Sequence, residues 1–146
     1  MQKFINISNH PISKWDESQK RKAGLLGGVE GIDIPFPNVP PEADVLPLAR
    51  ELVAEVQAMG SPADEDVGIW GVHVMGEQTL CFPVVAELLR LGYNCLASTT
   101  ERKVIEKDGV KTSMFSFVKF RRYAYLPVEK KPLGYAVFES WGERDD

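Results

Sequence analysis

The chain has 146 residues, of which 44% are hydrophobic and 26% charged, a balance typical of one globular domain with its own core. No apolar run reaches the roughly 20 residues that cross a bilayer, and the start of the sequence lacks the layout of a signal peptide, so we expect a cytoplasmic protein without a membrane partner. The net charge of −4 argues against a general binder of long nucleic acids.

The first half of the chain predicts two strands, each followed by a helix. Residues 3–8 alternate apolar and polar side chains as a strand does, and a short helix is expected over 15–26, ended by Gly27 and Gly28. Residues 32–36 predict a second strand, which prolines stop. The clearest helix lies within residues 43–60, where apolar residues recur at three- and four-residue steps: Leu48, Leu52, Val56 and Met59.

The second half repeats this alternation before the pattern changes. Residues 67–75 form a near-continuous apolar run, which is typical of a strand covered on both faces. A helix with an apolar stripe follows and ends at Gly92, and Thr79 is expected as its N-cap, with Pro83 in the first turn. Residues 93–98 predict the next buried strand.

Two further β-like runs are joined by Asp108-Gly109, the strongest short signal for a hairpin. A two-residue turn at this dipeptide would pair Glu106 with Lys111 across the hairpin. Strict alternation along the second run would separate its residues into two faces, with Phe115, Phe117, Lys119 and Arg121 on one and Met114, Val118, Phe120 and Arg122 on the other.

Alternating strands and helices with short links predict an α/β fold, namely a Rossmann-like, mostly parallel sheet flanked by helices, with a C-terminal β-hairpin. We expect one domain over residues 1–123. Residues 124–146 are too apolar for a pure linker, and they predict a C-terminal extension that packs on the domain or on a partner subunit.

Three segments that follow strands are expected to meet at the carboxyl edge of the sheet, where open α/β sheets bind ligands. The second of them opens a helix, and the backbone N–H groups and dipole of a helix start favour an anion. Each segment also has an ordinary structural interpretation, as a strand end or as a helix cap. The first two segments supply these candidates for ligand binding: Ser8, Asn9, His10, Gly76, Glu77 and Thr79.

The third segment, "STTER" at residues 98–102, follows a strand directly with hydroxyls and charges. Its hydroxyls can donate to phosphate oxygens, and the guanidinium of Arg102 can hold a phosphate through two hydrogen bonds. The alternative is a polar connection between strand and hairpin, whose threonines bond to the local backbone. The candidates in this segment are Ser98, Thr99, Thr100, Glu101 and Arg102.

This segment begins a cationic stretch in an otherwise acidic chain. Residues 98–123 contain seven Lys or Arg against three Asp or Glu, a local charge of +4. Lys119 and Arg121 are interleaved with aromatic residues, a pattern that can hold a phosphate and stack a base, or that can simply be a strand with one solvated face. A cationic strip on an acidic body suits a compact anionic ligand better than a long polyanion.

The sequence offers little for metal or nucleophilic chemistry. His73 lies inside an apolar run and is interpreted as a core histidine, and Cys81 and Cys95 as small buried hydrophobes without CxxC spacing. Glu77 and Asp33 could hold a hard cation, but nothing in their spacing demands it. We therefore expect no cofactor, no metal and no nucleophile supplied by the protein.

Several segments together resemble a known group of proteins. "INISNHPISKW", "IDIPFPNVPP", "VHVMGEQT", "ASTTERKV" and "FSFVKFRRY" are similar to segments of small accessory proteins of type III CRISPR systems, in the CARF-like, Rossmann-type group that contains extrinsic ring nucleases. The resemblance covers most of residues 3–123, and its more specific parts are "TTER" and the aromatic-rich strand. The tail after Tyr123 has no counterpart in it.

The resemblance implies a ligand and a reaction. The ligand would be a cyclic oligoadenylate, above all cyclic tetra-adenylate, bound by a homodimer or a higher homo-oligomer. The ring would be cleaved without a metal when a ribose 2′-OH of the substrate attacks the adjacent phosphorus. The product would carry a 2′,3′-cyclic phosphate, and its formation would switch off antiviral signalling.

The resemblance also implies roles for individual residues. Arg102 would stabilise the charge of the transition state, Thr100 would orient phosphates together with Ser98 and Thr99, and His10 would contact a base or assist proton transfer. These roles make Arg102, Thr100 and His10 the candidate catalytic residues.

Three rival interpretations stay open. The protein could bind or sequester the ring without cleaving it, because binding and slow cleavage need the same hold on phosphate. It could be a metal-dependent enzyme on a nucleotide or sugar phosphate, with Glu77 and Asp33 as ligands. It could also be a docking protein whose aromatic tail is the functional part.

Overall fold

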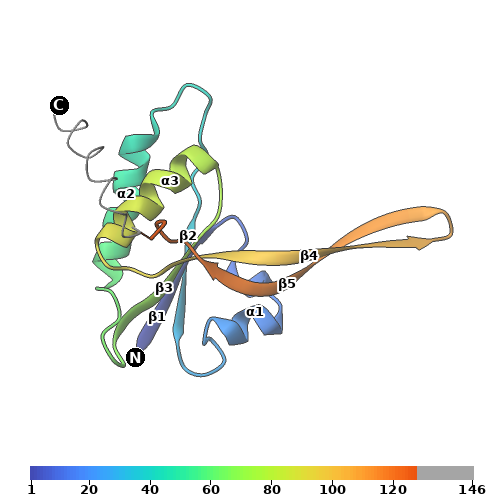
Figure 1. Ribbon diagram of the computed structural model, residues 1–146, viewed down its shortest axis with the longest axis horizontal. Coiled ribbons are helices and arrows are strands. Elements are labelled where there is room, and N and C mark those ends of the chain that lie inside the picture. The colour runs from blue at the N-terminus through green and yellow to red at the C-terminus, as the bar shows by residue number, and fades with distance from the viewer. Residues whose placement is uncertain (128–146) are drawn as a thin grey trace, which may run out of the picture.

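The computed structural model describes residues 1–127, and within them five strands form one mixed sheet in the order β2-β1-β3-β4-β5 (Figure 1). The first four strands of this order run parallel to their neighbours, and β5 runs antiparallel to β4. This arrangement confirms the Rossmann-like, mostly parallel sheet with a C-terminal hairpin. The strands are β1 Gln2–Ser8, β2 Glu30–Pro35, β3 Gly68–Val74, β4 Cys95–Lys107 and β5 Val110–Arg122, and the helices are α1 Glu17–Lys22, α2 Val45–Met59 and α3 Gln78–Arg90, with a 3₁₀ turn at Ile12–Lys14.

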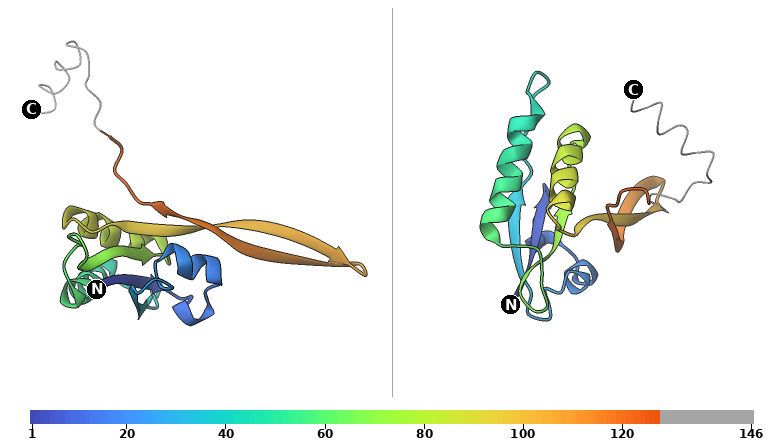
Figure 2. Two further views of the ribbon diagram at one scale, coloured as in Figure 1. Left: turned by 90° about the horizontal axis from the view of Figure 1, so that it is seen from below. Right: turned by 60° about the vertical axis from the view of Figure 1, so that its left-hand side comes forward.

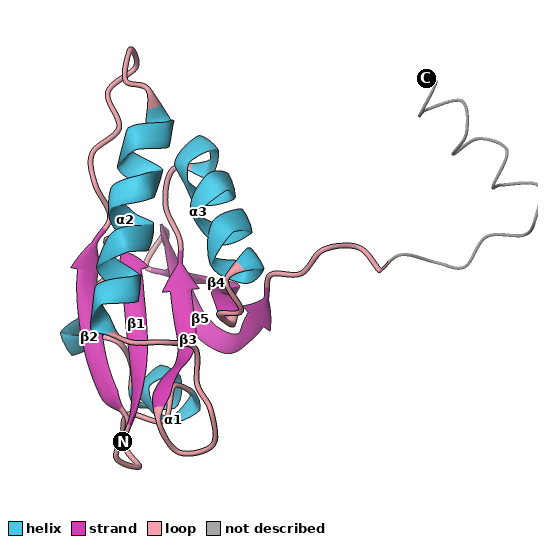
Figure 3. Ribbon diagram, turned by 90° about the vertical axis from the view of Figure 1, so that its left-hand side faces the viewer, coloured by secondary structure: helices cyan, strands magenta, loops and turns pink. Residues whose placement is uncertain are grey.

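Helices cover both faces of the parallel strands, and the central strands β1 and β3 are mostly buried, whereas most residues of the edge strand β2 are exposed. Figure 3 shows α2 and α3 side by side on one face and α1 on the other. Ile5 and Ile7 of β1 pack toward α2 and α3, whereas Phe4 packs with Trp15 and Leu96 on the side of α1. Burial on both faces explains why β3 is a near-continuous apolar run.

Two helices differ in their bounds from those predicted from the sequence. The helix expected over 15–26 is shorter, because Asp16 caps it by accepting from Gln19 N (2.7 Å) and Gly24 leaves helical geometry with φ +84°. The expected Thr79 cap of α3 is wrong. Glu77 is the N-cap and accepts from Leu80 N at 2.9 Å, so the helix begins two residues earlier and Pro83 lies inside it.

The segment "STTER" is part of a strand, which corrects its interpretation as a connection. β4 runs without a break from Cys95 to Lys107, because its polar second half pairs with β5 along its whole length. The Asp108-Gly109 turn is confirmed, with φ of 54° and 78° at these two residues, as is the pairing of Glu106 with Lys111.

The strict alternation expected along β5 is wrong near its end. Thr99 pairs with Lys119 but Thr100 pairs with Phe117, so Val118 is an extra residue that forms a β-bulge. The bulge turns Phe117 toward the side of Phe120, and the centres of their rings lie 4.9 Å apart.

The outer part of the hairpin projects from the rest of the fold, as Figures 1 and 2 show. We call residues 101–116 the hairpin arm, and every one of them is exposed. Within the part of the chain that the structure describes, the hairpin pairs with the parallel sheet through Val72–Cys95 and His73–Leu96. On the side of α1, Phe120 fixes its base by packing against Phe4, Trp15 and His73.

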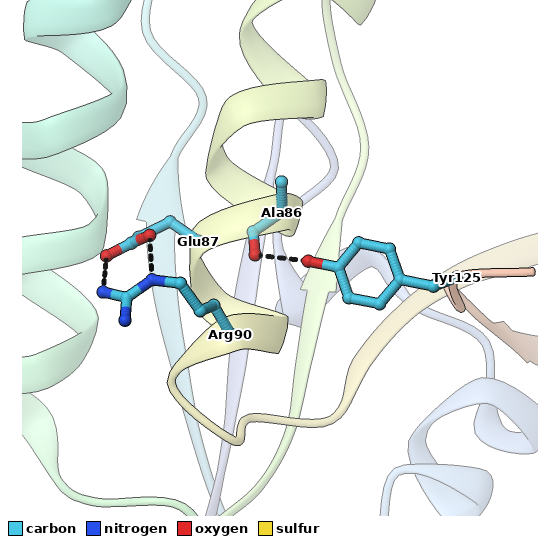
Figure 4. Close-up of polar contacts among 4 residues, drawn as sticks. All are labelled: Ala86, Glu87, Arg90 and Tyr125. Atoms are coloured by element: carbon cyan, nitrogen blue, oxygen red, sulfur yellow. Dashed lines mark hydrogen bonds and ion pairs between the residues drawn. The ribbon is translucent and has the colours of Figure 1, made fainter. Parts of the chain in front are cut away.

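After β5 the chain returns to α3. Tyr123 donates its hydroxyl to Val74 O (2.8 Å), and Tyr125 donates to Ala86 O (2.9 Å), next to the Glu87–Arg90 ion pair on the same helix (Figure 4). From residue 128 on, the extension predicted over 124–146 lies outside the described residues. None of the helices within residues 1–127 has the length and apolarity needed to cross a membrane.

The core under α3 gives a test of this packing. Leu88 is completely buried, so we expect Leu88→Ala to lower the free energy of unfolding by about 2–5 kcal/mol, because the substitution removes buried methylenes and leaves a cavity. Leu126 is 92% exposed, and Leu126→Ala should change this free energy by less than about 0.5 kcal/mol. Urea titration followed by circular dichroism measures both, and equal costs would contradict the packing described.

Candidate functional site at the carboxyl edge of the sheet

The carboxyl ends of β1 and β3 and the first part of β4 meet at a pocket of about 440 Å³, a size typical of small-molecule sites. Gln19, His73 and Met75 form part of its lining. The structure thus brings together one or more candidates from each of the three predicted segments. Five of the candidate residues line this pocket: Ser8, Asn9, His10, Gly76 and Ser98.

A row of hydrogen-bonded polar side chains crosses the sheet beneath this pocket. Asp33, Asn6 and His73 stand opposite one another on β2, β1 and β3. Asn6 Nδ2 donates to Asp33 Oδ1 (2.8 Å), Asn6 Oδ1 lies 2.8 Å from His73 Nδ1, and His73 Nε2 lies 3.0 Å from Ser98 Oγ. The row therefore runs from Asp33 to Ser98, where it reaches the pocket.

The hydrogen bonds of this row determine where its protons lie. Asn6 Nδ2 donates to Asp33 and to the carbonyl of His10, so its Oδ1 is the acceptor for His73. His73 must then carry its proton on Nδ1, which leaves Nε2 as an acceptor. Ser98 Oγ also lies 3.0 Å from Met75 Sδ, and its single proton can be donated either to this sulfur or to His73 Nε2. When it is donated to Nε2, the lone pairs of the Ser98 oxygen can accept a proton from a ligand.

His73 is held in its neutral form. Burial lowers its pKa to about 4, with a smaller contribution from the positive charge of His10. A buried histidine with both ring nitrogens bonded fits its interpretation as a core residue. The bond to Ser98 also connects His73 to the pocket. His73 can therefore be a buried structural residue and also accept a proton from the site.

Glu77 and Thr79 lie at the start of α3, at the edge of the site. Glu77 accepts from Thr79 Oγ1 (2.6 Å) and from Leu80 N, and these bonds hold its pKa below the ordinary value. The ionised Glu77 already complements the positive end of the helix, which leaves this position less suited to a phosphate. Glu77 also lines a neighbouring pocket of about 340 Å³, which shares Asn9 with the first.

Gly76 is required by close packing at the turn between β3 and α3. A Cβ atom at this position would lie 2.4 Å from the ring of Phe36, which is shorter than any real contact. The main chain can therefore approach Phe36, which lines the neighbouring pocket, only because residue 76 lacks a side chain.

Apart from Ser98, the candidates on the hairpin do not line either pocket. Thr99 donates to Lys119 O at 3.1 Å, and the guanidinium of Arg102 donates to Ser113 Oγ at 3.0 and 3.2 Å. Along an extended strand, Arg102 lies about 13 Å beyond Ser98. Thr100, Glu101, Lys119 and Arg121 also lie on β4 and β5 outside both linings. Roles in the site for these residues stay predictions.

The described residues offer little support for a metal site or for a reactive thiol. Asp33 Oδ1 is bonded to Asn6 Nδ2 and to Ile12 N, and no group of three or more His, Cys, Asp and Glu side chains within residues 1–127 is placed to hold a metal ion. Both cysteines are buried, and burial raises the pKa of Cys95 to about 12, so this thiol is a poor nucleophile.

Asn6 belongs to this row but is not among the residues predicted from the sequence. A signal for the row exists, since Asn6, Asp33 and His73 each stand alone between two β-branched residues, in "INI", "IDI" and "VHV". A single polar residue at the same place in three apolar strand segments indicates a shared hydrogen-bonded row rather than three separate positions.

The lowered pKa of His73 predicts a pH dependence of stability. The unfolded chain binds a proton at this residue below about pH 6.5, but the folded chain does so only below about pH 4. The free energy of unfolding should therefore fall by roughly 3 kcal/mol as the pH drops through this window, and then level off. Urea titrations at several pH values measure it.

The variant His73→Gln should not show this fall in the free energy of unfolding between about pH 6.5 and pH 4. The matched control His10→Gln removes a histidine that is exposed and should keep it. Parallel curves for the wild type and His73→Gln would contradict a neutral, buried His73.

Comparison with known proteins places the chain in a family. The model of the family described as "Uncharacterized protein MJ1673 family" matches residues 2–121, which include every described helix and strand except the last residue of β5. No curated protein and no solved structure matches the chain. The protein belongs to the MJ1673 family.

Proposed function

We propose that the protein binds a cyclic oligoadenylate, cyclic tetra-adenylate in particular, and cleaves the ring without a metal, as a ring nuclease that switches off type III CRISPR signalling. The observation that carries the proposal is the Ser98 hydroxyl, which is bonded to the acceptor nitrogen of His73 and lies in a pocket built by the segments of the resemblance. The adjacent pocket that shares Asn9 offers a second position for an extended ligand.

The reaction would proceed by in-line attack within the substrate. The ribose 2′ oxygen forms a bond to the adjacent phosphorus, and the bond from phosphorus to the 5′ oxygen breaks. The 2′ proton passes to Ser98 Oγ while the proton of Ser98 moves to His73 Nε2. The 5′ oxygen takes a proton from His10 or from water, so the products are a 2′,3′-cyclic phosphate and a free 5′ hydroxyl.

The charges around the pocket suggest how the ligand lies. The carboxylate of Glu77 would repel a phosphate and can accept a hydrogen bond from a ribose hydroxyl. Phosphates would lie toward the cationic hairpin, whose residues 98–123 carry a local charge of +4, but Lys119 and Arg121 pair with Thr99 and Ala97 and so lie on the face opposite Ser98. Because a base with a pKa of about 4 accepts protons weakly, slow cleavage is expected.

The role proposed for Arg102 requires a second copy of the chain. In a single chain this residue lies about 13 Å from Ser98, beyond the reach of its side chain. An arm from a neighbouring copy could bring Arg102 to the pocket. In this proposal each site therefore combines Ser98 of one chain with Arg102 of another.

The first prediction separates binding from cleavage. Ser98→Ala should bind cyclic tetra-adenylate within a few-fold of the wild type but cleave it about 10²-fold or more slowly, because the proton acceptor is lost. Calorimetry measures binding, and chromatography of labelled tri-, tetra- and hexa-adenylate rings, with and without EDTA, measures linear product. Ser116→Ala, an exposed serine on the arm, is the control and should cleave normally.

Absence of binding to all three rings would contradict the proposed function. Binding without any linear product would leave a sequestering protein. Activity that EDTA abolishes and magnesium restores would indicate the metal-dependent alternative.

The second prediction concerns Arg102. Arg102→Ala alone should slow cleavage by about 10²–10³-fold, because one charge-stabilising donor is lost. Mixing Arg102→Ala chains with Ser98→Ala chains should restore activity at about a quarter of the sites, since half of the pairs are mixed and each has one complete site. Failure of mixing to restore activity would show that the two residues do not act across chains.

A further inference from the structure

The hairpin arm exposes apolar side chains on both of its faces. Residues paired directly across the hairpin share a face, so Phe115 and Val104 lie on one face and Met114, Ile105 and Val110 lie on the other. Between 49% and 68% of each of these residues is exposed. An isolated two-stranded ribbon is at best marginally stable in water, so the arm lacks the cover that such ribbons need.

A matching apolar pocket lies on the body of the same chain, beside α3. It has a volume of about 530 Å³, and Met75, Cys81, Phe82, Val85 and Tyr123 form much of its lining. Phe82 is 76% exposed, although it is a large aromatic residue on a helix with a well-buried opposite side. Exposed apolar surface of this kind, next to a pocket, is typical of a binding site for a protein segment.

The net charges of the two parts favour a second copy as the partner. Residues 98–123 carry a charge of +4, whereas residues 1–97 contain seven Lys or Arg and thirteen Asp or Glu, a charge of −6. A hairpin and a body of opposite sign attract each other between copies. Most of this positive charge lies at the base of the hairpin, in Lys119, Arg121 and Arg122, since the arm itself carries four cations and three anions. A mixture of this kind on the arm does not favour a nucleic acid.

We propose that the hairpin arm of one copy binds the apolar pocket beside α3 of a second copy, and that the second arm does the same in return. Such an exchange makes a symmetric dimer in which each interface occurs twice. Met75 and Gly76 line both this pocket and the candidate site, so a docked arm lies next to the candidate site. The proposal does not depend on the identity of the ligand.

The test is the molar mass of the full chain in solution, with no nucleotide present. Sedimentation equilibrium should give twice the 16.3 kDa of one chain. Phe115→Asp on the arm and Phe82→Asp in the pocket should each weaken the dimer at least tenfold, because each places a carboxylate in an apolar contact. Leu126→Asp, which changes an exposed leucine outside both surfaces, should leave the dimer intact.

Since Phe82 and Phe115 are exposed in the single chain, both variants should keep the circular dichroism of the wild type. Met114→Asp provides a second arm variant should Phe115→Asp fail to fold. A monomeric wild type, or a dimer that neither arm nor pocket variants weaken, would overturn the proposal. A monomer whose arm binds RNA or DNA would also overturn it. If shortening the chain after Pro127 made Phe82 newly accessible to chemical labels, the removed residues would be the occupant of the apolar pocket, and the proposal would again be overturned.

Discussion

The structure depends on hydrogen bonds that satisfy polar side chains inside a sheet covered on both faces. Each buried polar group left without a partner costs about 1–3 kcal/mol, so Asn6 and His73 are tolerated only because they are paired with each other and with Asp33 and Ser98. A shift of one residue between two strands would break these pairs and turn Asn6 toward α2 and α3. The same bonds that fix the register therefore also fix the proton on His73 and the orientation of Ser98.

The regular elements could be predicted from the sequence because their signals are local. Apolar runs and glycine stops define the strands and helices, and Asp108-Gly109 specifies its turn through two positive φ angles. The position of "STTER" could not be predicted in this way. A polar segment continues as a strand when a partner strand satisfies its backbone, and only the pairing with β5 supplies that partner. The bulge at Val118 has the same origin in pairing rather than in composition.

The candidate site was predictable in part. Ser8, Asn9, His10 and Gly76 follow strands of a parallel sheet, and topology alone brings such residues to one edge. Arg102 and Thr100 were expected at the same place, because a connection would have folded back over that edge. The continuous strand carries them outward instead. His73 looked like a core residue because burial is visible in a sequence, whereas the contact of Nε2 with Ser98 depends on which strands are neighbours.

The shape of the hairpin leaves its length free to vary. β4 leaves the body of the fold next to Leu96, and β5 returns to it at the paired residue Arg122. The hairpin therefore begins and ends at the same place on the sheet. Residues could be added or removed in opposing pairs near the turn without altering the alignment of β1, β2 or β3, because none of these strands contacts the outer segment. The span of the hairpin can therefore change without altering the alignment of the sheet.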